Sequence, residues 1–367
     1  MSAKKKILFI MHMPPPVHGA AMVGQFVHDS GLINSEFEAE YINLATAKSL
    51  EDIGSLRLGK IASYFSLYRK IVLSVKKGRP DLVYITPNAK GVSFFKEYLI
   101  VQKIKRMGVN IIAHYHNKGV SQKQDNWLYD RLYRLFFKGL KVILLSERLF
   151  PDIEKYVNIE DVFFCPNAIP DNSENVSGKI VTSPHIRILF LSNLLPDKGP
   201  IVLLDALTIL KTRGYSFDCD FVGAETKQID SINFNEEINC KGLLGEVAYH
   251  GKKYGEDKES FWRKADIFVF PTEYECFPLV LLEAMQHHLP VISTREGGIP
   301  DIVVEGETGY LVEKGDSTEL ADRIENLILS PELRVQMGER GYERYMSNYT
   351  INIWEKRLCN ILKAAIQ

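Results

Sequence analysis

The stretch from Ile267 to Asp301 constrains the fold most, because it alternates short strands and a helix within a few dozen residues. The run IFVFP, residues 267–271, has the length and composition of a buried strand. Apolar residues at helical spacing follow, and a second short run, PVIST at residues 290–294, leads into two glycines. Short buried strands joined by a helix are typical of a parallel sheet with crossover helices. The stretch therefore predicts an α/β fold.

Two carboxylates in this stretch, Glu275 and Glu283, have seven residues between them and flank the predicted start of the helix at Pro278. Glu275 precedes the first turn, beside free backbone N–H groups and the positive end of the helix dipole. Glu283 lies within an otherwise apolar helix, where a carboxylate is rare without a partner. In this pattern one carboxylate can accept hydrogen bonds from a diol, and the other can accept them from a second polyol. The backbone amides at the helix start can bind an anion between the two. A sugar nucleotide presents that set of groups.

The surrounding residues resemble a known family. The segment PTEYECFPLVLLEAMQHHLPVISTREGGIPD resembles the donor-binding half of the retaining glycosyltransferases of family 4, in which the pattern is P-S-x-x-E-G-F-G, E-A-M-A-x-G-x-P-V-V and G-G-I-P-E. The chain departs from it at Cys276 and Pro278, where glycines are usual, and at His287-His288. Because Pro278 lacks an N–H, the resemblance implies that amides near Phe277 and Leu279 orient the hexose.

The loop from Ser192 to Gly199 opens a helix in a second strand–loop–helix unit. Lys198 at this helix start is a point charge suited to a diphosphate. The family has an arginine in this loop, at the position of Asn193 here. Gly223 follows a strand, and Lys253 follows another strand that resembles the family's nucleobase loop.

The spacing of Asp218 and Asp220 imitates a D-x-D metal site. Both aspartates lie in a predicted strand, however, and alternation puts them on one face of it. We interpret them as strand residues and predict no metal site.

The first half of the chain begins with a strand, Ile7 to Met11, a small-residue loop containing Gly19, and a helix. Such a helix start is an anion site, and a glycine allows close approach of the backbone. A later strand at residues 109–113 runs into His114-Tyr115-His116, and residues beyond strand ends line the crevice of α/β sheets. The resemblance implies that His116 contacts the donor sugar near the reacting carbon, with His114 as the alternative.

Length and charge limit the remaining possibilities. A chain of 367 residues suits two domains, and a net charge of −1 argues against a dedicated nucleic-acid binder. Residues 1–178 carry 24 basic and 17 acidic residues, whereas the remainder has a net charge of −8. Five scattered cysteines indicate a reducing cytosol, and no run approaches the roughly 20 apolar residues of a membrane span. We expect a cytoplasmic protein.

Seven basic residues and no acidic one occur between Arg57 and Arg79, interleaved with aromatic and aliphatic residues. Residues 131–141 repeat the pattern. Such segments fit a helix packed on a sheet with solvated lysines, and equally fit a basic amphipathic helix lying on the anionic inner face of a cell membrane. The sequence leaves both interpretations open.

The resemblance covers nearly all of residues 186–365 and, more loosely, residues 5–170. It implies the GT-B fold, two facing Rossmann-like domains with a cleft between them. The expected parts are an acceptor-side domain at 1–172, a polar linker at 173–185, a nucleotide-sugar domain at 186–345 and a last helix, 346–367, that packs back on the first domain.

The implied activity is metal-independent and cofactor-free transfer of a hexose, with retention, from a nucleotide-diphosphate sugar to a glycan or polyprenyl-linked acceptor in cell-surface polysaccharide synthesis. A sugar-nucleotide epimerase of the same fold and a non-catalytic nucleotide-sugar-binding partner subunit are the alternatives. The donor base, sugar, acceptor, linkage and oligomeric state stay open. The expected catalytic residues are His116, Glu275 and Lys198. The expected donor-binding residues are Gly19, Asn193, Lys198, Gly223, Lys253, Glu275, Phe277, Pro278, Leu279 and Glu283.

Overall fold

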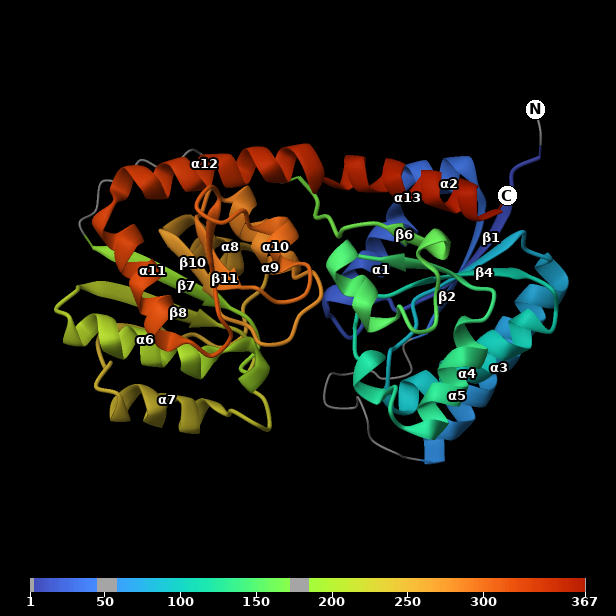
Figure 1. Ribbon diagram of the computed structural model, residues 1–367, viewed down its shortest axis with the longest axis horizontal. Coiled ribbons are helices and arrows are strands. Elements are labelled where there is room, and N and C mark those ends of the chain that lie inside the picture. Colours follow the sequence, from blue (N-terminus) through green and yellow to red (C-terminus); the bar gives the residue numbers. More distant parts are fainter. Residues whose placement is uncertain (1–2, 45–57, 172–184, 367) are drawn as a thin grey trace. The chain divides into compact units, whose positions relative to one another are not determined.

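The computed structural model describes residues 3–44, 58–171 and 185–366 (Figure 1). The chain divides into two compact units. Unit 1 comprises residues 1–168 and 351–367, and unit 2 comprises residues 169–350. Apart from His185, the predicted linker lies outside the described residues.

Unit 1 is built on a parallel sheet whose order, among the described residues, is β2-β1-β3-β4-β5-β6. The inner strands are buried on both faces, which is why they appear in the sequence as continuous apolar runs. The strands are β1 (Lys6–Met11), β2 (Glu38–Asn43), β3 (Leu82–Ile85), β4 (Asn110–His114), β5 (Lys141–Leu144) and β6 (Val162–Phe164).

Helices cover both faces of this sheet. Figure 1 shows α3, α4 and α5 on one side, and α2 and α13 on the other. The helix α13 comes from the end of the chain, so unit 1 is assembled from two separate segments. The helices are α1 (Gly19–Asp29), α2 (Gly31–Glu36), α3 (Leu58–Gly78), α4 (Gly91–Lys105), α5 (Trp127–Phe137) and α13 (Ile351–Ile366).

Unit 2 repeats the design with a parallel sheet of order β12-β11-β10-β7-β8-β9 in the described part of the chain. The helix α9 packs on α12, and α6 packs on α11. The strands are β7 (Ile186–Leu191), β8 (Phe217–Val222), β9 (Val247–Tyr249), β10 (Ile267–Phe270), β11 (Val291–Thr294) and β12 (Gly309–Val312). The helices are α6 (Pro200–Thr212), α7 (Ser231–Cys240), α8 (Gly255–Lys264), α9 (Leu279–Gln286), α10 (Ile299–Ile302), α11 (Ser317–Leu329) and α12 (Pro331–Asn348).

Both sheets are doubly wound. In unit 1 the strand order reverses beside β1, and in unit 2 it reverses beside β7. In such sheets ligands bind outside the carboxyl ends of the strands at this switch point. The predicted α/β class with two Rossmann-like halves is confirmed, and the loops after β1 and β7 are the places to look for a site. Within the described residues, no helix has the length and apolarity needed to cross a membrane.

Candidate active site

The loops that follow β7 and β10 bring together two of the predicted catalytic residues. Lys198 ends a 3-10 turn, Pro196–Lys198, directly before α6. Its Nζ donates to Glu275 Oε1 at 2.7 Å and to the Tyr274 carbonyl oxygen at 2.9 Å. Both side chains of this ion pair are partly exposed, at 16% for the lysine and 25% for the glutamate. The cation and the carboxylate therefore lie in contact at the carboxyl edge of the sheet, within reach of a ligand.

A glycine makes this contact sterically feasible. Gly199 has a left-handed backbone with φ of 76°, and a Cβ there would lie 2.1 Å from the Pro271 carbonyl oxygen. Only glycine fits such a position. The turn that carries Lys198 is thereby packed directly on the residue that follows β10.

Glu283 has the partner that a carboxylate on an apolar helix requires. Its Oε2 accepts a hydrogen bond from Lys258 Nζ of α8 at 2.5 Å, and both side chains are about a quarter exposed. The helix α9 turns this residue toward α8 and solvent, so the carboxylate is partly exposed. The sequence carried no signal for Lys258, since 25 residues separate the pair.

The start of α9 differs by one residue from the prediction. Pro278 is the N-cap with an extended ψ of 124°, and the helix begins at Leu279. Phe277 and Pro278 are buried, and the Phe277 ring contacts Tyr349 edge-on at 5.8 Å between centroids. Their side chains belong to the core, so a ligand could meet only their backbone. Leu279, by contrast, is half-buried and lies off the buried face of α9, which consists of Leu281, Leu282, Ala284, Met285 and Gln286.

Asn193 and Gly223 hold the loops after β7 and β8 together. Asn193 Oδ1 accepts a hydrogen bond from Ala224 N at 3.1 Å. A Cβ on Gly223 would lie 1.8 Å from the Ser192 carbonyl oxygen, so this glycine is required by close packing. Gly223 N also donates to the Gly251 carbonyl oxygen at 3.0 Å. At the position where the family pattern has an arginine, Asn193 therefore links the loops after β7 and β8 by a hydrogen bond.

Lys253 lies half-buried in the loop after β9, next to the exposed Lys252, whose ammonium lies 4.7 Å from the centre of the Tyr254 ring. Asp218 and Asp220 lie in β8, and both form ion pairs with Arg187, at 2.9 and 3.5 Å. The shared partner confirms that the two carboxylates lie on one face of the strand. Among the described residues, no group of His, Cys, Asp and Glu side chains is arranged to hold a metal ion.

In unit 1, Gly19 begins α1, and a Cβ there would meet no other atom of the protein within 4 Å. Close approach of the Gly19 backbone to a phosphate stays a prediction. The glycine that packing within the protein requires is Gly24, where a Cβ would lie 1.9 Å from the His12 carbonyl oxygen. The sequence could not distinguish them, because the contact joins the middle of α1 to the residue after β1. The helix N-cap is His18, whose Nδ1 accepts from Ala21 N at 3.3 Å.

Histidines gather at the carboxyl ends of β1 and β4. His114 is fully buried and its Nδ1 lies 2.6 Å from the Tyr84 hydroxyl. The rings of His114 and His116 are 4.1 Å apart, and both ring nitrogens of His116 are buried. His12 and His18 also lie together, with ring centroids 6.2 Å apart. The sequence analysis identified His114 and His116 but did not include His12 or His18.

Burial dominates the charge state of this histidine group. It lowers the pKa of His116 to about 3, reinforced by His12 and His18, while Asn167 acts in the opposite direction. It lowers the pKa of His12 to about 4, again with a contribution from His18. Burial also lowers the pKa of His18 and holds that of His114 well below its usual range. The imidazoles are therefore neutral at physiological pH and can each donate one hydrogen bond and accept another.

The loop after β3 is held by a buried carboxylate that the sequence analysis missed. Glu97 of α4 is 4% exposed and accepts hydrogen bonds from Asn88 N at 2.6 Å and Asn88 Nδ2 at 2.8 Å. Burial raises the pKa of Glu97 to about 7, against the lowering effect of both Asn88 donors. Asn117 supports the same loop by accepting from Ala89 N at 2.6 Å. This loop lies next to the histidine-bearing end of β4.

The structure thus gathers Lys198, Glu275, Asn193 and Gly223 at the switch point of unit 2, with Glu283 on the adjacent helix. His116 and Gly19 occupy the corresponding edge of unit 1. Each group is organised within its own unit by contacts that join loops following neighbouring strands.

One comparison concerns the family and another concerns the fold. Residues 174–344 match the family model of glycosyl transferases group 1. Over all but a few residues the fold is that of solved GT-B proteins. The structure of Anabaena HepE in complex with UDP and glucose has a TM-score of 0.73 at 18% identity, covering 98% of this chain and 99% of that one. The apo form of the lipopolysaccharide outer core galactosyltransferase WaaB has a TM-score of 0.72 at 16% identity, covering 98% and 99%.

Sequence relatives are more similar but match shorter segments. The capsular polysaccharide biosynthesis glycosyltransferase CapM of Staphylococcus aureus is 33% identical over 168 residues, 46% of this chain and 43% of that protein. N-acetyl-alpha-D-glucosaminyl L-malate synthase of Bacillus anthracis is 41% identical over 103 residues, 27% of each chain. The chain therefore spans less than half of the length of these relatives. The predicted GT-B fold is confirmed, and residues 174–344 form a glycosyl transferases group 1 region.

Proposed function

We propose that the chain is a retaining, family 4-type glycosyltransferase. It moves a hexose from a nucleotide-diphosphate sugar to a glycan or lipid-linked acceptor in cell-surface polysaccharide synthesis. The observation that carries this proposal is the contact between Lys198 and Glu275 at the switch point of unit 2, 2.7 Å between Nζ and Oε1. The capsular role named for CapM and the galactosyltransferase activity named for WaaB support a polysaccharide or lipid-linked product.

Each charged residue has a distinct role in this proposal. Glu283 accepts hydrogen bonds from the ribose hydroxyls, in place of its bond to Lys258 Nζ. Lys198 and the N-terminus of α6 neutralise the diphosphate, and charge that develops on the leaving phosphate is stabilised there without a metal ion. Glu275, released from Lys198 as the diphosphate binds, orients the hexose hydroxyls. The ion pairs seen in the structure therefore hold both carboxylates in place before the donor arrives.

His116 supports the reacting face of the sugar as a neutral hydrogen-bonding group. Its lowered pKa, about 3, means that it does not bring a positive charge to the donor at physiological pH. Gly223, Lys253 and the backbone of Phe277 to Leu279 complete the donor site, and Gly19 lies beside the phosphate. Exclusion of water from these groups would limit hydrolysis of the donor.

UDP is the first nucleotide to test, because the structures of HepE and of TarM from S. aureus hold it. The change is Lys198→Met, which removes the ammonium and keeps much of the aliphatic length. We expect UDP affinity, measured by calorimetry, to fall roughly 10- to 100-fold, since a charge-assisted bond to a phosphate is lost.

The matched control is Lys211→Met, which removes a lysine of the same unit whose Nζ also pairs with a glutamate at 2.7 Å. It lies on α6 away from the carboxyl edge of the sheet, so UDP affinity should not change. Undiminished binding by the Lys198 variant would remove this lysine from its assigned role.

A second experiment separates the candidate functions. Release of UDP from UDP-sugars only when an acceptor is present indicates a transferase and not an epimerase. Nucleotide binding without turnover would identify a non-catalytic subunit.

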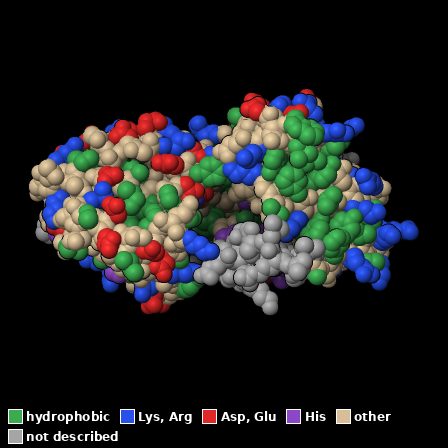
Figure 2. Space-filling view, turned by 90° about the horizontal axis from the view of Figure 1, so that it is seen from below, with side chains coloured by type: hydrophobic (Ala, Val, Ile, Leu, Met, Phe, Trp, Pro, Cys, Tyr) green, Lys and Arg blue, Asp and Glu red, His purple; other side chains and the backbone are tan. Residues whose placement is uncertain are grey.

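We also propose that the protein works at the cytoplasmic face of the cell membrane through the outer surface of α3, α4 and α5. Half of the large apolar side chains that are exposed in the described residues lie on these three helices. Figure 2, which looks onto this side of unit 1, shows hydrophobic and basic side chains gathered together. The apolar side chains are Phe65 and Leu73 of α3, Val92 and Leu99 of α4, and Trp127, Leu128 and Leu135 of α5.

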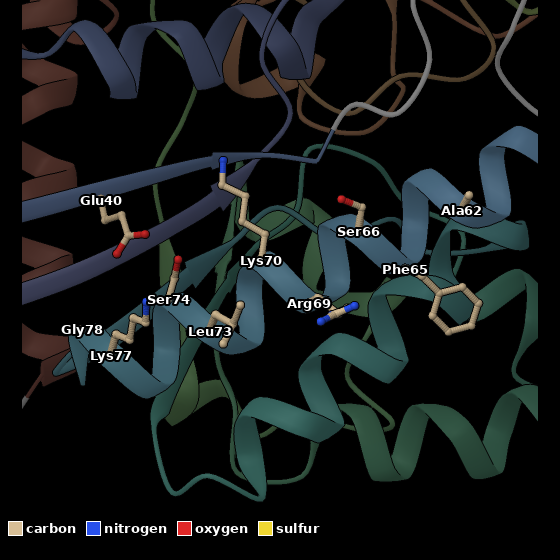
Figure 3. Close-up of a pocket in the computed structure, with 10 residues that line it drawn as sticks. All are labelled: Glu40, Ala62, Phe65, Ser66, Arg69, Lys70, Leu73, Ser74, Lys77 and Gly78. Carbon is tan, nitrogen blue, oxygen red and sulfur yellow. The ribbon is translucent and has the colours of Figure 1, made fainter.

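The α3 surface combines apolar and cationic groups in one open groove of about 1010 Å³. Phe65, Arg69 and Leu73 follow one another at helical spacing, and Lys70 and Lys77 line the same groove (Figure 3). Glu40 of β2 also lines this groove, whereas Glu97 of α4 is buried and Asp130 of α5 pairs with Arg134 and Lys155. Among the described residues the groove thus presents apolar side chains between Arg69, Lys70 and Lys77 with one carboxylate beside them, a net cationic surface that complements an anionic lipid headgroup layer.

Flotation with vesicles tests the membrane contact. We expect the protein to float with phosphatidylglycerol vesicles at low salt and to stay behind with phosphatidylcholine vesicles. Reversing two charges on α3, R69E/K70E, should weaken the partition at least about tenfold, since each basic residue contributes about 1 kcal/mol. The control K227E/K264E reverses two exposed charges of unit 2 and should float normally. Equal binding to both lipids, or none at low salt, would reject the surface.

A further inference from the structure

Four charged side chains follow four neighbouring strands of unit 2, and the roles proposed above use two of them. In the sheet order β12-β11-β10-β7, the loops after these strands carry Lys314, Glu296, Glu275 and Lys198. The two outer residues are cations and the two inner ones are carboxylates. Lys314 Nζ lies 2.7 Å from Glu296 Oε2, the same distance as in the Lys198–Glu275 pair. The two ion pairs therefore lie side by side along one edge of the sheet.

Glu296 is a buried carboxylate, with 4% of the residue exposed. A charge in that position is costly unless it is paired and hydrogen-bonded. Lys314 supplies the pairing, and because its own side chain is 48% exposed, the ammonium keeps contact with water on its other side. The second oxygen, Glu296 Oε1, faces the backbone N–H of Glu275 at 3.5 Å between N and O.

The two residues after Glu296 hold the same piece of backbone. Gly298 N donates to the Cys276 carbonyl oxygen at 2.7 Å. Gly297 has φ of 53°, and a Cβ there would lie 2.3 Å from the Glu275 carbonyl oxygen. Residues 296–298 thus contact the main chain of Glu275 and Cys276 at successive polar atoms. A displacement of Glu296 would therefore also displace Glu275, whose side chain contacts Lys198.

We propose that Glu296, held in place by Lys314, is a positioning residue that fixes the Glu275 carboxylate for the hexose of the donor. This inference rests on the proposed function, in which Glu275 orients the sugar. The nucleotide end of the donor is assigned to Glu283 and Lys198, which Glu296 does not contact. Its effect should therefore appear in sugar transfer and not in nucleotide affinity.

The test compares E296Q with the wild type for the transfer rate at saturating donor and for UDP affinity by calorimetry. We expect kcat to fall roughly 10- to 100-fold, because small displacements of an orienting group are costly, while the Kd for UDP stays within about twofold. The matched control is E246Q, which removes one partner of another 2.7 Å lysine pair, with Lys211, near the start of β9 at the opposite edge of the sheet. Its kcat should equal that of the wild type.

A second comparison uses variants of Lys314, whose ammonium pairs with Glu296. K314M leaves the buried Glu296 charge without its cation, so it should lose more activity than E296Q. The double variant E296Q/K314M should be more active than K314M, because a neutral amide leaves no unpaired charge. Such a rescue would not be expected if Lys314 merely filled space.

Three outcomes would overturn the inference. The first is an unchanged kcat in E296Q, and the second is a UDP affinity that falls together with the melting temperature, which would indicate a structural role. The third is additive losses in the double variant.

A wild-type protein that binds UDP but transfers no sugar to any acceptor would refute the proposed function and the positioning role with it. Normal wild-type transfer that E296Q leaves intact refutes the positioning role alone.

Discussion

At the scale of single residues, the candidate site depends on charges that are paired before any ligand is bound. Lys198 and Glu275 neutralise one another, as do Lys258 and Glu283. A donor must therefore replace one partner of each pair, and the difference between the old and new interactions sets its affinity. Pre-paired charges also keep the two carboxylates from repelling an incoming diphosphate.

Glu97 gives a prediction about pH. Its folded-state pKa of about 7 lies above the ordinary value of 4.5, so the folded protein retains this proton more strongly than the unfolded chain. The contribution of Glu97 to stability is thus complete below about pH 4.5 and is lost as pH rises through 7, a difference of about 3 kcal/mol. E97Q cannot ionise and should gain stability relative to the wild type between pH 5 and pH 8.

Urea unfolding of both proteins at these two pH values measures this gain. Histidine titration is common to both proteins and cancels in the comparison. E154Q, a change at an exposed glutamate of the same unit, should show no such difference. A stability difference between E97Q and the wild type that is the same at both pH values would show that Glu97 does not hold a proton in the folded state.

At the scale of elements, periodicity predicted strands and helices well because each needs only local information. The apolar runs at 267–270 and 291–294 are strands, and a helix lies between them. Periodicity does not predict contacts between segments that are distant in the sequence. Lys258 meets Glu283 only because α8 lies beside α9, and Gly24 matters only because α1 packs on the residue after β1.

The resemblance to a family added what periodicity could not. It selected Glu275, Lys198 and His116 from many polar residues, and the structure brings the first two into contact. Where the chain departs from the family, the resemblance was of less use. Asn193 is a brace between loops, and Glu296 precedes the glycine pair as a buried charge, a feature that the family pattern does not contain.

Lys105 gives a prediction for a helix end. Its Nζ donates to the carbonyl oxygens of Leu135, Phe136 and Lys138, at 2.9, 2.6 and 2.7 Å, where α5 ends. These carbonyls have no partner within the helix, and the negative end of its dipole favours a cation. Burial, with a contribution from Lys138, lowers the pKa of Lys105 to about 8.

K105M should destabilise unit 1 by about 1–2 kcal/mol, through loss of the cap at the end of α5. The melting temperature should fall by several degrees in calorimetry, while K103M, a change two residues away on the same helix, should have little effect. Because the folded-state pKa of Lys105 lies below the ordinary value of 10.5, the unfolded chain binds the proton more strongly above pH 8, so the stability advantage of the wild type over K105M should grow between pH 8 and pH 10. A difference that stays constant over this range would contradict the lowered pKa of Lys105.

At the scale of the whole molecule, the two units should respond separately to damage in their cores. Trp354 of α13 is 1% exposed and lies in unit 1, although it is close in sequence to unit 2. W354A should cost unit 1 about 3–5 kcal/mol, because a large cavity remains. Hydrogen exchange in increasing urea should show early loss of protection in residues 3–44 and 58–168, with residues 185–350 unchanged.

N352A, which alters an exposed residue two positions earlier in α13, serves as the control and should match the wild type. Equal loss of protection in both units of W354A would show that they unfold together and that the division into two compact units has no energetic counterpart.

The return of α13 to unit 1 has a consequence for the order of synthesis. Lys363 pairs with Glu36 at 2.7 Å, and Lys141 Nζ donates to the Ala364 carbonyl oxygen at 3.0 Å, so a helix translated after unit 2 packs on the segment of unit 1 translated before it. While the ribosome makes residues 169–350, the earlier segment must wait with one sheet face lacking its final helix. That apolar surface stays uncovered until α13 has been made.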